Sequence, residues 1–173
     1  MPSPSLIGFE HRVVVGVGEM AISNNPNVVL ATYSLGSCLG IGIYDPVVRV
    51  GGLLHAMLPD SSIHPAKALA HPAMFIDTGV PALFRAAYEL KADKHRIRVV
   101  VAGGAQILDS QGFFNIGKRN LEALTTLLAS HRLEIAAQQI GGLVNRTVYL
   151  NVNSGVINLK VSGQPNEVLL WKP

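Results

Sequence analysis

The order of apolar and polar positions divides the chain into several strand-like segments and two helix-like segments. Runs rich in β-branched residues and bounded by turn residues are typical of strands. Two other segments place apolar residues three or four positions apart, as one face of a helix does. They cover residues 73–91, where Pro81 interrupts the pattern, and residues 117–131. The strand-like segments are 12–22, 27–35, 38–45, 48–58, 96–105, "LEIAAQQIGG", "RTVYLNV" and "GVINLKVSG". The pattern predicts an α+β domain with more strand than helix.

Two of these strands are expected to form a β-hairpin. The segment "CLGIGIYD" closes on the turn dipeptide Asp45–Pro46, and "VRVGGLLHAML" follows it at 48–58. Residues equally far from a hairpin turn lie side by side, so we expect Cys38 and His55 to be neighbours. His55 is surrounded in the sequence by apolar residues, and a polar ring there needs a structural or chemical reason.

Composition limits the class of protein. The chain has 173 residues, of which 49% are apolar and 14% charged, which predicts one packed domain rather than a disordered chain. A single cysteine excludes an internal disulfide framework. The N-terminus lacks a basic segment followed by an apolar one, and no apolar run reaches the roughly 18 residues of a membrane span. We therefore expect a cytoplasmic protein without membrane insertion.

The charge pattern does not suggest nucleic-acid binding. The net charge is +3, from 14 basic and 11 acidic residues, and the excess is dispersed. The densest basic stretch is "KADKHRIR", residues 91–98, and no aromatic residue interleaves with it. Nucleic-acid binding surfaces combine basic residues with aromatic ones or with a recognisable motif. We expect no nucleic-acid partner.

The single cysteine, Cys38, lies in the glycine-rich stretch "TYSLGSCLGIG". Backbone N–H groups near Gly36 and Ser37 are candidates for stabilising an oxyanion beside a nucleophilic thiol. His55 is the candidate base, and the hydroxyl of Thr32 or of Ser34 is placed to accept a hydrogen bond from the other ring nitrogen. Structural alternatives stay open: a small apolar cysteine, a core histidine and a β-branched Thr32 that fills a strand.

Five motifs in order resemble one known family. They are "SLGSCLGIGIYDP", "GGLLHAMLP", "AGGA" at 102–105, "IGKRN" at 116–120 and "GGLVNR" at 141–146. With these five motifs in this order, the chain resembles the chemoreceptor glutamine deamidase family of bacterial chemotaxis, CheD. The resemblance implies a cysteine hydrolase that converts glutamine side chains of methyl-accepting chemotaxis receptors to glutamate. Cys38 would be the nucleophile, His55 the general base and Thr32 the orienting residue. No metal or organic cofactor is implied.

The resemblance also implies a fold and partners. The fold is a mixed β-sandwich flanked by helices, similar to the catalytic domain of cytotoxic necrotizing factor toxins. We expect a single domain over 1–173, with loose termini at 1–11 and 164–173. Besides the receptors, a CheC-type phosphatase is the implied partner in species that have one.

Two positions depart from the usual pattern of this family. Asn145 stands where many members have glycine, and Gln139 where an acidic residue is common. Asparagine tolerates a left-handed backbone, so the turn at Asn145 is expected to be kept. Arg119 and Asn120 are expected to be structural or to line the substrate surface.

Two other interpretations remain at this point. The first is a regulatory binding module that docks a phosphatase or the receptor array with little or no turnover. Thiol reactivity would separate it from an enzyme, because a catalytic cysteine is expected to have a depressed pKa. The second is a metal site formed by His55, His64 and His71. It is disfavoured because His64 and His71 both precede proline, where helical backbone is avoided.

Overall fold

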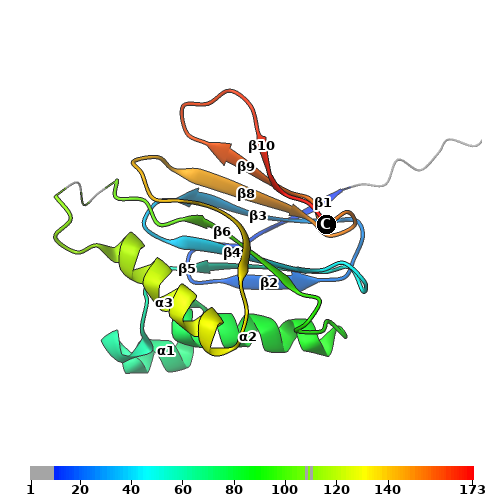
Figure 1. Ribbon diagram of the computed structural model, residues 1–173, viewed down its shortest axis with the longest axis horizontal. Helices are drawn as coiled ribbons and strands as arrows, with labels where there is room; N and C mark the ends of the chain where they lie inside the picture. Colours follow the sequence, from blue (N-terminus) through cyan, green and yellow to red (C-terminus); the bar gives the residue numbers. More distant parts are fainter. Residues whose placement is uncertain (1–9, 108, 110) are drawn as a thin grey trace, which may run out of the picture.

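Two mixed five-stranded sheets packed face to face form the centre of the computed structural model, which describes residues 10–107, 109 and 111–173 (Figure 1). Strands β1 and β3 are parallel, as are β6 and β7, and the other paired strands are antiparallel. The first sheet has the order β1 (His11–Val14), β3 (Val28–Leu35), β8 (Arg146–Asn151), β9 (Ile157–Val161), β10 (Val168–Trp171). The second has the order β2 (Met20–Ser23), β5 (Val50–Ala56), β4 (Leu39–Asp45), β6 (Arg98–Gly103), β7 (Ile135–Ile140).

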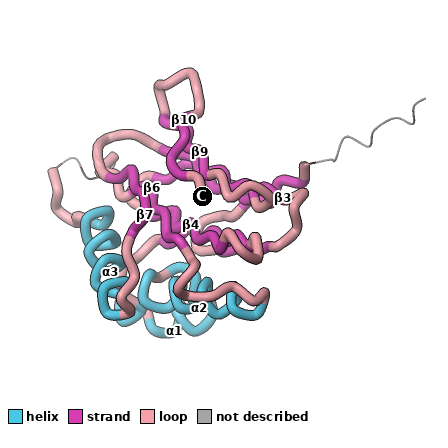
Figure 2. Tube along the Cα trace, turned by 45° about the vertical axis from the view of Figure 1, so that its right-hand side comes forward, coloured by secondary structure: helices cyan, strands magenta, loops and turns pink. Residues whose placement is uncertain are grey.

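The helices gather on one side of this sandwich. They are α1 (Pro65–Ala70), α2 (Ile76–Glu89) and α3 (Ile116–Ser130), with short 3-10 turns at Ser61–Ile63 and Pro72–Met74. Figures 1 and 2 show them together beside the second sheet, while β9 and β10 lie on the opposite side. The buried faces of α2 and α3 form one core with the outer face of the second sheet. No helix in the described ranges has the length and apolar character needed to span a membrane.

Alternation along β4 and β5 decides which side chains lie between the sheets. Successive strand residues point to opposite faces. Leu39, Ile41 and Leu54 therefore belong to the core under the helices. Gly40 and His55, which are directly opposite each other in the β4–β5 ladder, face the first sheet instead. A Cβ on Gly40 would lie 2.7 Å from Cδ1 of Leu35 and 3.5 Å from Cγ2 of Thr32, so glycine lets the two sheets approach closely here.

The hairpin and both predicted helices are confirmed. The helix predicted over residues 73–91 differs from expectation at Pro81. α2 continues through Pro81 without a break. The hydroxyl of Thr78 donates a hydrogen bond to the carbonyl oxygen of Pro72 at 2.6 Å, and Phe75 occupies the N-cap position.

Two expectations about the ends of the chain are wrong. Residues 12–22 do not form one strand, because the chain turns at Gly18, which has φ of 72°, and β1 and β2 join different sheets. The C-terminal segment is not loose over Val168–Trp171, since β10 pairs antiparallel with β9. The Trp171 ring packs edge-on to Tyr44 at 6.3 Å between centroids, which holds this end of the chain on the sandwich. Residues 1–9, expected to be loose, lie outside the described residues.

Candidate active site

Cys38 lies in the short loop that joins β3 of the first sheet to β4 of the second. Its side chain is half-buried and packs against the core between the sheets. The thiol lines a cavity of about 610 Å³ together with Gly36 and Ser37 of the same loop and Ser34 near the end of β3. The opposite wall comes from the segment after β6 and from the first turn of α3, including Ile116 and Gly117. The cysteine is therefore open to molecules outside.

His55 and Thr32 form a buried pair between the sheets. Their side chains are joined by a hydrogen bond of 2.7 Å between Nδ1 of His55 and Oγ1 of Thr32. The Thr32 hydroxyl also bonds the carbonyl oxygen of Val15, at 2.7 Å. Since a carbonyl oxygen can only accept, the hydroxyl proton points to Val15, and Oγ1 must accept a hydrogen bond from the Nδ1–H group of His55. The proton of neutral His55 therefore sits on Nδ1, and Nε2 carries the free lone pair.

The remaining nitrogen of His55 is placed for chemistry. Nε2 is buried and has no hydrogen-bond partner among the described residues. Cys38 precedes Gly40 by two residues, and Gly40 is the ladder partner of His55. Such diagonal neighbours on one face are roughly 7–8 Å apart at Cα, within reach of long side chains. No hydrogen bond joins the thiol to the ring in this structure, and catalytic hydrogen bonds often tighten only when substrate binds.

Burial keeps the Cys38 thiol and the His55 ring neutral. Desolvation raises the pKa of the Cys38 thiol, and the backbone N–H of Cys38 opposes this to a smaller extent. Desolvation also lowers the pKa of His55. The depressed thiol pKa expected for a catalytic cysteine is therefore not found. The arrangement is a neutral thiol beside a neutral imidazole, which suits proton transfer during attack rather than a preformed thiolate.

The carbonyl groups of the loop at Cys38 are engaged in hydrogen bonds, whereas two of its N–H groups have no acceptor among the described residues. Gly36 O accepts from Ala105 N at 2.8 Å, and Cys38 O accepts from Gly104 N at 3.0 Å. The carbonyl of Ser37 accepts from Asn120 Nδ2 at 3.1 Å. In the described part of the chain, no acceptor is found for the N–H groups of Gly36 and Ser37. Two donors are thus available next to the thiol.

Two glycine motifs hold this loop in place by close backbone contact. Gly103 has φ of 113°, and a Cβ there would lie 2.2 Å from the carbonyl oxygen of Cys38. A Cβ on Gly117 would lie 2.4 Å from the carbonyl oxygen of Gly104. The tight turn at 102–105 therefore supports the cysteine loop on one side and the start of α3 on the other. This explains why "AGGA" and "IGKRN" occur in one chain.

A loop with two exposed aromatic rings borders the cavity. The side chain of Asp109 accepts hydrogen bonds from the N–H groups of Phe113, Phe114 and Asn115 at 2.7–2.9 Å, which shapes the loop. Phe113 is 83% exposed and Phe114 is 71% exposed, and Phe114 lines the cavity. Phe113 and Phe114 were not among the candidate site residues predicted from the sequence. The signal was present, because an adjacent pair of aromatic residues follows "AGGAQ" outside any apolar pattern.

The other candidates divide between the surface and the interior. Arg119 is exposed and lies within electrostatic reach of Asp60, but it does not line the cavity. Asn120 is fully buried, so it cannot contact substrate in this structure. Its amide instead donates to the carbonyls of Ser37 and Met57 at 3.1 Å and so supports the cysteine loop. Ser34 lines the cavity and does not bond His55.

The two unusual positions lie beside the site. Asn145 lines the cavity and does not have positive φ; the left-handed positions of its turn are Gly141 and Gly142. Gln139 accepts a hydrogen bond from Nε of the buried Arg146 at 3.0 Å. The guanidinium also donates to the carbonyls of Gly103 and Gly141 at 3.3 and 2.8 Å, and burial lowers the pKa of Arg146.

The histidines considered for a metal site have other surroundings. The Nδ1 atom of His64 accepts a hydrogen bond from the N–H of Lys67 at the start of α1, and His71 follows the end of that helix. Within the ranges that the structure describes, no group of three or more His, Cys, Asp and Glu side chains gathers in a metal-binding arrangement.

Comparison with known proteins shows one consistent family. Residues 57–161 match the family described as "CheD chemotactic sensory transduction". The chain is 46% identical over 153 residues to "Probable chemoreceptor glutamine deamidase CheD 1" of Syntrophus aciditrophicus, covering 88% of this chain and 96% of that protein. It is 42% identical to "Probable chemoreceptor glutamine deamidase CheD" of Solibacter usitatus, covering 91% of this chain and 94% of that protein. An archaeal relative from Pyrococcus horikoshii is 35% identical over 86% of this chain and 91% of its own.

Among solved structures, the chain has a distant likeness to the hypothetical protein YfiH of Bacillus licheniformis. The TM-score is 0.40 with 13% sequence identity, and the alignment covers 78% of this chain and 60% of that chain.

Proposed function

Because the chain belongs to the CheD family, we propose that it is a chemoreceptor glutamine deamidase with a cysteine nucleophile. The substrates are glutamine side chains of methyl-accepting chemotaxis receptors, and the products are glutamate and ammonia. The observation that carries this proposal is the buried Nε2 of His55, which has no hydrogen-bond partner in the described part of the chain and lies on the face of the hairpin that Cys38 shares. Thr32 holds the opposite ring nitrogen at 2.7 Å.

In the first half of the reaction, Nε2 of His55 takes the proton of the Cys38 thiol as sulfur attacks the amide carbon. A C–S bond forms, and the carbonyl electrons move to oxygen. The N–H groups of Gly36 and Ser37 donate to this oxyanion, and one such donor typically contributes about 3–4 kcal/mol to the transition state. When the intermediate collapses, the C–N bond breaks. The proton on Nε2 passes to the leaving nitrogen, which departs as ammonia and leaves a thioester on Cys38.

In the second half, water attacks the thioester while Nε2 of His55 takes one of its protons. The second tetrahedral intermediate uses the same two backbone donors. Its collapse breaks the C–S bond, releases the glutamate side chain and returns the proton to sulfur. Thr32 is a positioning residue, since it keeps the other ring proton on Nδ1 and leaves Nε2 free in both halves. Protons and electrons balance without a metal or a cofactor.

The surroundings of Cys38 favour a protein substrate. The cavity of about 610 Å³ has an exposed aromatic rim at Phe113 and Phe114. Such a rim suits contact with the apolar surface of a helix while the glutamine side chain reaches the thiol. Arg119 is exposed in the first turn of α3. We expect its side chain to contact the same receptor surface. Three further properties implied by the resemblance belong to this proposal. The fold is similar to the catalytic domain of cytotoxic necrotizing factor toxins, the protein docks to a CheC-type phosphatase, and it is located in the cytoplasm.

Ammonia release from a purified receptor cytoplasmic domain tests the proposal. Mass spectrometry of the receptor would follow conversion of glutamine to glutamate. We expect conversion by the unaltered protein and none by Cys38→Ala or His55→Ala. His64→Ala is the matched control, because His64 is exposed at the start of α1. Conversion by Cys38→Ala would refute the mechanism. Binding of receptor or phosphatase without conversion by the unaltered protein would favour a regulatory binding module.

A further inference from the structure

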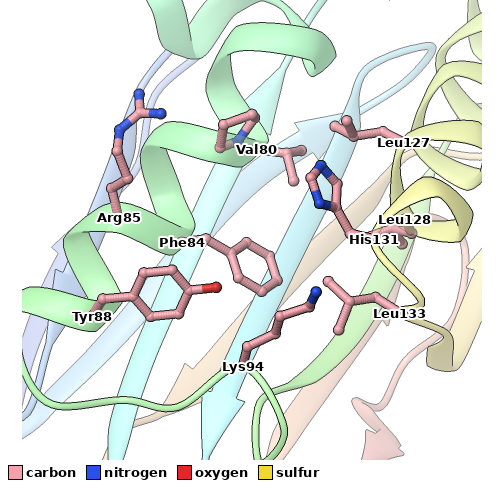
Figure 3. Close-up of a pocket in the computed structure, with 10 residues that line it drawn as sticks. Val80, Phe84, Arg85, Tyr88, Lys94, Leu127, Leu128, His131 and Leu133 are labelled. Atoms are coloured by element: carbon pink, nitrogen blue, oxygen red, sulfur yellow. The ribbon is translucent and has the colours of Figure 1, made fainter.

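A second cleft opens between α2 and the end of α3, away from Cys38. Phe84 and Tyr88 of α2 form one wall, and Leu127 of α3 with Leu133 forms the other (Figure 3). The volume of the cleft is about 190 Å³. Because α3 has 15 residues, this cleft at its C-terminal end lies roughly 20 Å from the N-terminal turn that borders the Cys38 cavity. The cleft is therefore separate from the proposed catalytic site and does not depend on it.

Basic side chains border the cleft. Lys94 and His131 line the cleft together with Phe84 (Figure 3). A neighbouring cavity of about 650 Å³ shares Lys94 and His131 and adds His95, Arg98 and Arg132. The apolar cleft thus continues into a basic surface formed largely by residues 94–98 and the chain just after α3.

Nearby acidic groups do not neutralise this basic surface. Within the described ranges, no carboxylate forms an ion pair with Lys94, Arg98 or Arg132. Asp93 lies 3.8 Å from the guanidinium of Arg96 instead, and Glu134 is the one acidic residue that lines the second cavity. Favourable interaction with the C-terminal end of α3 accounts for the placement of Arg132. It does not account for Lys94 and Arg98, which belong to the segment before β6 and to β6 itself.

The size of the cleft limits what can occupy it. A dry apolar cavity of about 150 Å³ holds a benzene-sized group, whereas pockets that enclose a whole drug-sized ligand measure about 300–1,000 Å³. The occupant therefore inserts one bulky apolar group and extends over the adjoining basic surface. Charge complementarity requires the extended part to be acidic. We propose that this cleft binds an acidic segment of a partner protein that inserts one large apolar side chain between Phe84 and Leu127.

Selection of short random peptides displayed on phage against the full-length protein tests this inference. We expect enriched peptides to carry one large apolar residue flanked by acidic residues. Their synthetic forms should bind with an affinity that falls as salt is raised, because the basic rim is partly solvated. The double variant Lys94→Glu/Arg132→Glu should raise Kd at least about tenfold, since each charge reversal removes one exposed attraction and adds a repulsion. Leu127→Trp, which fills the cleft, should abolish binding.

Matched variants show whether these effects are local. Lys160→Glu on β9 changes one exposed cation in the other sheet, and Leu69→Trp adds the same ring at a position that is 89% exposed. Both should bind the peptides like the unaltered protein, and thermal unfolding would verify that every variant is folded. Absence of acidic, apolar-anchored peptides from the selection would overturn the inference, as would equal binding by the double variant. Binding of benzoate or of phosphatidylglycerol vesicles, without peptide binding, would assign the cleft to a small anion or to a lipid surface instead.

Discussion

Replacing Thr32 with valine isolates the role of a single hydroxyl group. Valine has the shape of threonine but cannot accept a hydrogen bond from the Nδ1–H group of His55 or donate one to the carbonyl oxygen of Val15. Thr32 is fully buried and His55 is 1% exposed, so water does not replace the lost bonds. Each of the two groups left unpaired costs about 1–3 kcal/mol. We expect the free energy of unfolding to fall by about 2–6 kcal/mol in total.

The effect on activity follows from the tautomer of His55. Without the Thr32 oxygen, no hydrogen bond favours the tautomer of His55 that carries its proton on Nδ1. Part of the protein then has the proton on Nε2, where it blocks proton transfer from Cys38. A buried hydrogen bond worth about 1–3 kcal/mol corresponds to a fall in kcat of roughly fivefold to 150-fold. KM for the receptor should stay unchanged, because Thr32 does not line the cavity.

Receptor deamidation kinetics, followed by ammonia release, would measure this effect. Thr32→Ser keeps the oxygen and should restore most of the activity. Tyr44→Phe is the control for stability alone, because it removes a buried hydroxyl that donates to the Val152 carbonyl at 2.9 Å, away from Cys38. It should lower stability without lowering kcat. A folded Thr32→Val protein with unchanged kcat would show that Thr32 does not set the tautomer of His55.

Four further predictions concern protonation and packing. Burial lowers the pKa of His55, so the acidic limb of kcat/KM should have its midpoint below the ordinary histidine value of about 6.5. Burial raises the pKa of Cys38, so its rate of alkylation by iodoacetamide should reach half its maximum above the ordinary thiol value of about 8.5. Gly103→Ala should lower the free energy of unfolding by more than about 2 kcal/mol and abolish activity, as followed by urea denaturation and ammonia release. Gln139→Glu should raise the melting temperature by giving the buried Arg146 a counter-charge, an effect of about 1 kcal/mol.

Each of these four has a clear contrary result. An acidic midpoint at or above the ordinary histidine value would mean that His55 is stabilised as a cation in the working enzyme. Half-maximal alkylation well below the ordinary thiol value would indicate a preformed thiolate rather than a neutral thiol. An active and stable Gly103→Ala protein would contradict the close backbone contact with Cys38. A lower melting temperature for Gln139→Glu would show that the added carboxylate does not reach Arg146.

Local patterns in the sequence determined the hairpin that carries His55. The alternation of "CLGIGIYD" and "VRVGGLLHAML" around Asp45–Pro46 gave both strands, and their antiparallel pairing is a local consequence of a short turn. Because the pairing is local, the nearness of Cys38 and His55 could be predicted without the rest of the fold. The helices were predictable for a similar reason, since their apolar stripes repeat within each segment.

Tertiary structure alone decided which partners come from far along the chain. Thr32 meets His55 because β3 lies in the opposite sheet, and the choice between Thr32 and Ser34 depends on which face of β3 points inward. The separation of β1 from β2, the pairing of β10 with β9 and the burial of Asn120 likewise depend on contacts between distant segments. The cleft between Phe84 and Leu127 exists only because α2 and α3 pack side by side on one sheet. Periodicity reports what one segment buries but not which segment covers it, and that choice is made by the packing of the whole chain.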